Sequence, residues 1–194
     1  MSFVHDDVES PQLVGILARK TGIAAALIEK EYWVTHTLWA LHETGLEVWF
    51  KGGTSLSKGF SLIQRFSEDL YLMIQHGSVE GLPEVTSWTS KDPEKTREAF
   101  YAALAGTLAV PGVRVKRDES WIDERARGAD YLGYYPAGLI DQLAPAVSPF
   151  VRLEVGRPRV VPHVERRLGS FVRACLVEQD MLAGYAENRP TAVR

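Results

Sequence analysis

Two adjacent glycines, Gly52 and Gly53, constrain the fold of this chain more than any other feature. The run 46–50 before them is rich in β-forming residues, and the run 70–74 after them repeats that composition. Between the two runs, residues 55–65 have helical character, with Thr or Ser at the N-cap position. A strand, a turn, a helix and a second strand in this order are typical of an α/β or α+β domain. We therefore expect a mixed β-sheet flanked by helices.

The rest of the chain supplies further helices and strands around this unit. Apolar residues at helical spacing in 23–44 predict a long helix that packs on the core through an apolar stripe. Other helices are expected at 11–20, 93–110 and 168–185, other strands at 113–117, 131–135 and 150–155, and a charged loop at 118–128. Residues 1–45 would then be a helical segment packed on a core of residues 46–194, which together make one domain.

Composition excludes several classes of protein. The 194-residue chain is 45% hydrophobic and can bury a core, and its net charge of −3 argues against a strongly basic coat for nucleic acid. The single Cys175 cannot form an intrachain disulfide, and no Cys/His spacing predicts a zinc site. No apolar run is long enough to span a membrane and the acidic N-terminus does not resemble a signal peptide, so a cytoplasmic protein is expected.

The glycine turn has the properties of a phosphate site. Glycines allow the backbone to approach a phosphate closely, and the N-terminus of the following helix offers free N–H groups and a positive dipole end. The spacing differs from that of a P-loop. The alternative is a structural turn that binds nothing. The candidate phosphate contacts are Gly52, Gly53, Thr54 and Ser55, with Lys51 or Lys58 adding charge.

Carboxylates on two predicted strands have the properties of a metal site. Asp69 and Tyr71 are two residues apart on one strand and so face the same side, and Glu154 lies on the strand at 150–155. If these strands are neighbours, Asp69 and Glu154 could share one Mg²⁺ ion. The phenol of Tyr71, with a pKa of about 10, is a poor ligand in comparison. The alternative is that both carboxylates are ordinary polar strand residues.

Basic and aromatic residues suggest contacts with a nucleotide or RNA. The C-terminal third carries Arg152, Arg157, Arg159, Arg166, Arg167 and Arg173. Such a cluster could contact a triphosphate or an RNA backbone, or it could be a solvated face. Trp121, Tyr134 and Tyr135 could stack on bases or pack within the protein.

Four separated blocks of this sequence together resemble the AbiEii/AbiGii toxin family. The blocks lie in the order that the family shows, and the likeness runs from about Glu29 to the C-terminus. They are Glu29-Lys30-Glu31-Tyr32-Trp33-Val34, Phe50-Lys51-Gly52-Gly53-Thr54-Ser55-Leu56-Ser57-Lys58-Gly59, Leu62-Ile63-Gln64-Arg65-Phe66-Ser67-Glu68-Asp69-Leu70 and Val151-Arg152-Leu153-Glu154-Val155-Gly156.

The resemblance implies a DNA polymerase β-like nucleotidyltransferase core. Members of this family are toxins of bacterial toxin–antitoxin and abortive-infection systems. They would transfer a nucleotide from a nucleoside triphosphate, with Mg²⁺ or Mn²⁺, to an RNA acceptor such as tRNA, and a cognate antitoxin would be a partner. By this likeness Asp69 is the first metal carboxylate and Glu154 the third. Gly52, Gly53 and Ser55 would cradle the triphosphate, and Lys58 matches a lysine common in the motif.

The chain departs from the family pattern in two ways. The family motif ends in Asp-x-Asp, and Tyr71 stands at the second aspartate position. The later helical segment of the family, which carries a lysine and an acidic motif, has no match before Arg194. The alternative to an active transferase is therefore a degenerate member that binds nucleotide, RNA or an antitoxin without chemistry. A third alternative is an unrelated α/β binding domain.

Overall fold

The computed structural model describes residues 2–62, 69–75, 79–85, 94–121, 123–136, 138, 147–156, 163–186 and 191–193. Several predictions fall outside these ranges, namely the helix start at Asp92 and Pro93, the helix end at Arg65, and the basic residues Arg157 and Arg159. Across the described ranges, no helix has both the length and the apolar character that crossing a membrane requires.

The first two helices lie within two residues of their predicted ranges, whereas the later helices end before the predicted positions. The α-helices are α1 (Ser10–Thr21), α2 (Ala25–Glu43), α3 (Gly52–Thr54), α4 (Glu94–Thr107) and α5 (Phe171–Glu178), and short 3₁₀ turns cover Val4–Asp6 and Leu182–Gly184. Helix α3 continues as a π-type turn, η2 (Ser55–Gly59), so the helical segment after the glycines is shorter than predicted among the described residues.

The last predicted helix, 168–185, is wrong in extent. Ser170 begins α5 because its side chain accepts a hydrogen bond from the Arg173 backbone N–H at 2.9 Å. The helix ends before Asp180, whose φ of +57° is incompatible with a right-handed helix. Leu168 instead ends strand β6 (Arg166–Leu168), which pairs with β7 (Thr191–Val193) in a small two-stranded sheet.

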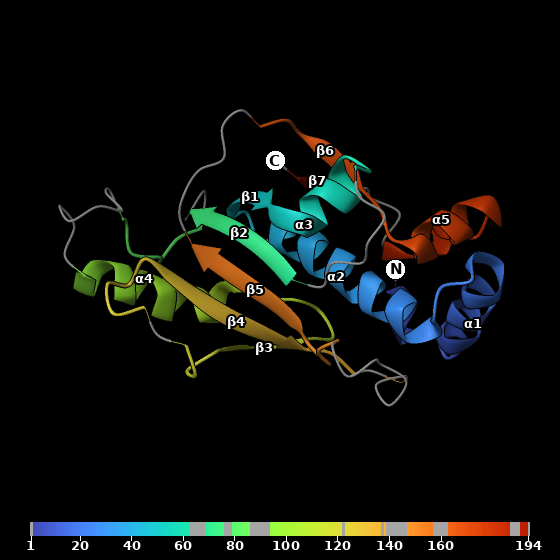
Figure 1. Ribbon diagram of the computed structural model, residues 1–194, viewed down its shortest axis with the longest axis horizontal. Helices are drawn as coiled ribbons and strands as arrows, with labels where there is room; N and C mark the ends of the chain where they lie inside the picture. The colour runs from blue at the N-terminus through green and yellow to red at the C-terminus, as the bar shows by residue number, and fades with distance from the viewer. Residues whose placement is uncertain are drawn as a thin grey trace.

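A five-stranded sheet forms the centre of the molecule. Its strands are β1 (Glu47–Lys51), β2 (Asp69–Gln75), β3 (Arg114–Arg117), β4 (Gly128–Tyr134) and β5 (Val151–Gly156). Their order across the sheet is β1-β2-β5-β4-β3, with β2 and β5 parallel and every other pair antiparallel. Figure 1 shows this twisted sheet, with β1 at one edge and β3 at the other. The sequence therefore predicted the fold class correctly: a mixed sheet with helices.

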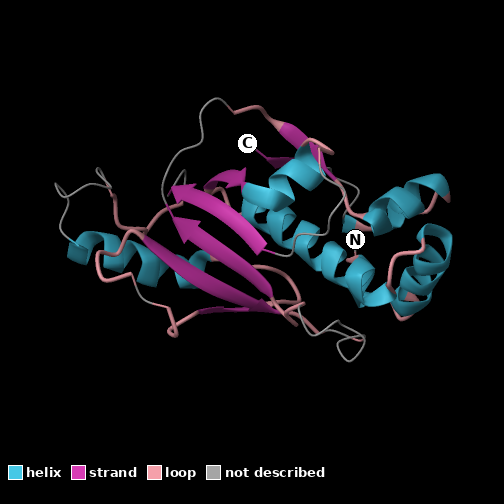
Figure 2. Ribbon diagram, viewed as in Figure 1, coloured by secondary structure: helices cyan, strands magenta, loops and turns pink. Residues whose placement is uncertain are grey.

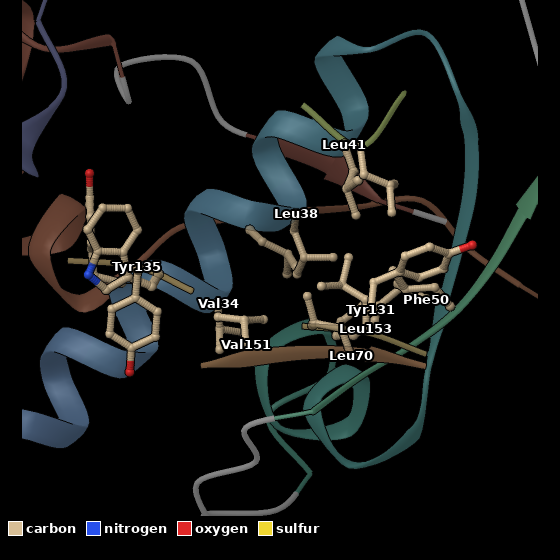
Figure 3. Packing of buried hydrophobic residues seen from close by; sticks show 14 of the residues in the cluster. Val34, Leu38, Leu41, Phe50, Leu70, Tyr131, Tyr135, Val151 and Leu153 are labelled. Carbon is tan, nitrogen blue, oxygen red and sulfur yellow. The ribbon is translucent and has the colours of Figure 1, made fainter. Parts of the chain in front are cut away.

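One face of the sheet is buried and the other is open. Side chains alternate between buried and half-buried along β5, so Val151, Leu153 and Val155 point to one face. Helices α2 and α4 pack on that face, behind the strands in the view of Figure 2. Figure 3 shows Leu38 of α2 above Leu153 and Tyr131 of the sheet. The opposite face is free to carry polar residues.

Helix α2 is buried on more than the predicted stripe. Its buried residues include the charged Lys30 and Glu31 as well as apolar ones such as Val34 and Leu41. Lys30 donates from Nζ to the backbone carbonyls of Ser148, at 2.7 Å, and Phe150, immediately before β5. The helix therefore fixes the start of a central strand through a buried ammonium group as well as through apolar packing.

Glu31 makes the matching contacts on the other side of α2. It forms an ion pair with Lys58 of η2 and accepts a hydrogen bond from the Phe171 backbone N–H at 3.0 Å. We call Lys30, Glu31 and Lys58 the buried clamp. It holds four segments together: α2, the turn after the glycines, the start of β5 and the N-terminus of α5.

Candidate functional site

The open face of the sheet carries a row of polar side chains that runs across four strands. Lys51 pairs with Tyr71, Tyr71 with Glu154, and Glu154 with Asp130 in the strand register. Directly paired residues point to the same face, so these four side chains are neighbours. We call Lys51, Tyr71, Glu154 and Asp130 the open row. Sequence reasoning anticipated three of its members and missed Asp130.

A second row on the same face brings in Asp69. Asp69 pairs with Arg152 across β2 and β5. This pair lies two residues along the strands from the pair of Tyr71 and Glu154, and so on the same face. Arg152 donates from Nη1 to Asp130 at 2.9 Å and to Asp118 at 3.1 Å. The sheet thus brings Asp69 and Glu154 onto neighbouring strands, as their use as a shared metal site requires. In the same arrangement the Asp130 carboxylate forms an ion pair with Arg152.

Tyr71 fills the space between the glycine turn and Glu154. Gly52 has a φ of +82°, and a Cβ built on it would lie 2.7 Å from Cδ2 of Tyr71. The position therefore needs glycine both for its backbone conformation and for the tyrosine ring. Tyr71 is paired with Glu154 across β2 and β5, so the phenol and the Glu154 carboxylate are neighbours on this face. Tyr71 is still 37% exposed, so its phenol borders the open face.

The structure separates the predicted phosphate contacts into two groups. Thr54 is fully buried, and its hydroxyl donates to the Asp69 carbonyl at 2.7 Å, which ties the turn to β2. Lys58 faces inward to Glu31 in the buried clamp. Gly52 is exposed and Gly53 and Ser55 are half-buried, so these three lie at the surface of the turn.

Lys51 is the lysine that lies at the open face. It borders a cavity of about 660 Å³, a volume within the range of small-molecule sites. Tyr71, Glu154 and Asp130 line the same cavity, and so does Trp121 from the loop before β4. The sequence offered Lys51 or Lys58 as a source of charge and the family resemblance favoured Lys58, whereas the strand pairing with Tyr71 places Lys51 on the cavity wall.

The carboxylates of this face repel one another. Burial raises the pKa of Glu154 above its ordinary value, and the nearby charges of Asp130 and Asp69 raise that pKa further. Burial also raises the pKa of Asp130, against the opposing hydrogen bond from Arg152. The Glu154 charge is the main cause of the raised pKa of Tyr71. A cation placed on this face would relieve the repulsion.

The acidic side chains on the open face fit one bound cation better than two. Among the described residues, no group of three His, Cys, Asp or Glu side chains is placed to hold a metal ion. Asp69 and Glu154 lie on neighbouring parallel strands, whereas Asp130 accepts a hydrogen bond from Arg152. Mg²⁺ is commonly bound by one or two carboxylates together with substrate phosphates, so the pair fits one Mg²⁺ that arrives with a triphosphate.

The missed residue has a simple explanation. The strand predicted at 131–135 begins at Gly128 in the structure, which adds Asp130 to the sheet. Small and acidic residues such as Gly128 and Asp130 are poor β-formers, so propensity placed the start of the strand too late. The structure shows alternating buried and half-buried positions from Ala129 to Leu132, whereas the residues of this run do not alternate between apolar and polar in the sequence.

The chain is similar to a known protein family over most of its length. The family model described as "Nucleotidyl transferase AbiEii toxin, Type IV TA system" matches residues 38–179. Among solved structures, the chain is similar to MenT4, a nucleotidyltransferase toxin from Mycobacterium tuberculosis H37Rv, with 19% identity and a TM-score of 0.45. That match covers 81% of this chain and 48% of MenT4, so the chain spans about half the length of that relative. No curated protein matches.

Proposed function

Because the chain belongs to the AbiEii nucleotidyl transferase toxin family, we propose that its open face binds a nucleoside triphosphate and transfers a nucleotide to an RNA acceptor such as tRNA. The observation that carries this proposal is the open row itself. It sets the cation Lys51 and the carboxylate Glu154 on either side of Tyr71 along one cavity wall, near the glycine turn and Asp69. A cognate antitoxin protein is the partner that the family implies.

In this proposal the chain's residues bind and orient the substrate. Gly52, Gly53 and Ser55 present backbone N–H groups and a hydroxyl to the triphosphate, and Lys51 adds charge from the cavity wall. Asp69 and Glu154 would hold Mg²⁺ or Mn²⁺, which neutralises charge on the phosphates. The acceptor hydroxyl attacks the α-phosphorus, the bond to pyrophosphate breaks, and the hydroxyl proton passes to one of the two carboxylates.

The contacts of Tyr71 favour a second candidate function. The phenol stands where a metal carboxylate is expected, packs on Gly52 and is paired with Glu154 on the neighbouring strand. A degenerate member with this site would bind nucleotide, RNA or an antitoxin without transferring anything. The two candidates differ only in whether Asp69 and Glu154 suffice for the chemistry.

Transfer of labelled nucleoside triphosphates to total RNA tests both candidates. The assay compares this chain with Tyr71→Asp and with Asp69→Asn, in Mg²⁺ and in Mn²⁺. Labelling by the unchanged chain that Asp69→Asn abolishes supports the transferase. Labelling by Tyr71→Asp alone supports a transferase site silenced at one ligand. Silence from all three, with no triphosphate binding either, would refute the proposal.

A further inference from the structure

The cavity on the open face has two chemically different ends. At the β1 end the cationic Lys51 lines the cavity, and the glycine turn follows it directly in the chain. At the β4 end the cavity is lined by Trp121 together with Asp123 and Arg127, all from the loop that precedes the strand. A nucleoside triphosphate has the same asymmetry, with a polyanion at one end and a flat aromatic base at the other.

The sheet leaves a gap beneath the aromatic end. Gly128 pairs with Gly156 in the row next to Asp130 and Glu154, on the same face of the sheet. Rows on one face are about 7 Å apart along the strands, and neither glycine carries a side chain into that space. A Cβ built on Gly128 would lie 3.5 Å from Cη2 of Trp121, so the indole borders the gap at van der Waals distance.

The loop that carries Trp121 is held in place from α4. Arg97 is 4% exposed and donates to the Arg125 carbonyl at 2.8 Å, and the Tyr101 hydroxyl donates to the Arg127 carbonyl at 3.0 Å. Asp123 accepts from the backbone N–H of Arg127 at 2.8 Å. Trp121 is nevertheless 47% exposed. An exposed indole on an anchored loop loses little conformational entropy when a ligand stacks on it.

We propose that the cavity end formed by Trp121, Gly128 and Gly156 is the subsite for the base of the nucleoside triphosphate, with the base stacked on the indole. The Asp123–Arg127 pair, at 2.9 Å, lies beside it and offers both an acceptor and donors to the edge of the base. This inference rests on the proposed function, because it assigns one end of the same cavity. It assigns a role to Trp121, which lies in a loop outside the glycine turn and the two carboxylate strands.

The subsite can be tested by calorimetric titration with two kinds of ligand, one with a nucleoside and one without. Each of the four nucleoside triphosphates and inorganic tripolyphosphate is titrated, with Mg²⁺, into the unchanged chain, Trp121→Ala, Trp121→Phe and Lys51→Met. We expect Trp121→Ala to weaken triphosphate binding about tenfold, the order expected for a lost stacked base, and to leave tripolyphosphate binding unchanged. Trp121→Phe should retain most of the affinity, whereas Lys51→Met should weaken both ligands.

Tyr134→Ala is the matched control for the loss of an aromatic ring. Tyr134 lies on β4, 36% exposed, and does not line this cavity in the described part of the chain. The subsite is overturned if Trp121→Ala changes neither ligand, or both equally, or only the binding of RNA. If the unchanged chain binds neither a nucleoside triphosphate nor tripolyphosphate, the proposed function fails as well, so the two failures are distinguishable.

Discussion

The open row and the buried clamp both contain charged residues, but the partners of those charges differ. In the clamp each charged group faces partners within the protein: Lys58 faces Glu31, and Lys30 faces two backbone carbonyls. On the open face the carboxylates of Asp69 and Glu154 crowd together. The comparison teaches that the blocks shared with the family include two kinds of residue. Some hold the turn in place, and others gather negative charge on the open face that a bound cation would offset.

Breaking the clamp should have the largest effect on stability. Glu31→Gln would leave the ammonium of Lys58, whose side chain is 14% exposed, without its counter-ion. Loss of one partner from a buried pair typically costs about 3 to 5 kcal/mol of unfolding free energy. Urea denaturation of the two proteins measures the difference.

The control for this comparison is an ion pair at the surface. Lys20 and Glu178 are each 55% exposed, and exposed pairs contribute little to stability. Glu178→Gln should therefore leave the urea midpoint unchanged within error. If Glu31→Gln shifts the midpoint no more than Glu178→Gln does, the clamp does not hold the turn, and the contrast between the two regions is wrong.

His36 is a third kind of ionisable residue in this comparison: a buried imidazole that burial keeps uncharged at neutral pH. It is 2% exposed, burial lowers its pKa to about 4, and its Nε2 donates to the Pro111 carbonyl at 2.9 Å. Because the folded-state pKa lies below the unfolded value of 6.5, the unfolded chain binds the proton first as the pH falls. Stability should therefore be complete above pH 6.5 and fall by about 3 kcal/mol between pH 6.5 and pH 4.

Urea midpoints across that pH range test the assignment to His36. His36→Gln places an amide N–H near the position of Nε2 and removes the titration, so it should keep the bond to the Pro111 carbonyl and flatten this part of the curve. The exposed His42 provides the control, because His42→Gln should leave the curve unchanged. An identical pH dependence in all three proteins would mean that His36 does not carry the effect.

Tyr71→Asp should turn the open face into a stronger cation site. The new carboxylate joins Asp69 and Glu154, and added like charge should cost on the order of 1 to 2 kcal/mol of stability in the presence of a chelator. Mg²⁺ binds the folded form and should restore that loss. Thermal melts with EDTA and with Mg²⁺ measure both effects, and a Mg²⁺ titration should show tighter binding.

Tyr71→Asn separates charge from the loss of the ring. It removes the phenol and its contact with Gly52 without adding a carboxylate, so its melting temperature should respond to Mg²⁺ as that of the unchanged chain does. Equal Mg²⁺ affinity in Tyr71→Asp and Tyr71→Asn would show that position 71 does not face the metal site.

Much of the fold could be predicted from the sequence because its strands are local patterns. The β-forming run before Gly52 and the alternation in 150–155 gave two strands of the sheet to within about one residue. The parallel pairing of β2 with β5 joins segments far apart in the chain, so sequence reasoning could state it only as a condition for Asp69 and Glu154. No local pattern encodes such a pairing.

The direction of side chains in the glycine turn was the least predictable feature. Hydroxyl and ammonium groups after two glycines are typical of a phosphate site, yet Thr54 and Lys58 both point inward. The π-type turn from Ser55 to Gly59 changes the rotation per residue, so a count by α-helical spacing misplaces Lys58. Its partner, Glu31, is 27 residues earlier in the sequence.

The smallest effect that we predict concerns the contact between Gly52 of the glycine turn and Tyr71 of the open row. Gly22 and Gly52 both have positive φ, +73° and +82°, so alanine at either position costs about 1 to 2 kcal/mol from backbone conformation alone. A Cβ at Gly22 would meet nothing within 4 Å, whereas at Gly52 it would lie 2.7 Å from the Tyr71 ring. Gly52→Ala should therefore destabilise the protein by about 1 kcal/mol more than Gly22→Ala.

A double-mutant cycle shows whether that excess comes from Tyr71. In a Tyr71→Ala background the ring is gone, so Gly52→Ala should cost no more than Gly22→Ala, and the coupling energy between positions 52 and 71 should account for the difference. If the excess persists without the ring, the strain lies in the turn itself. Tyr71 would then line the cavity without bracing the glycine turn.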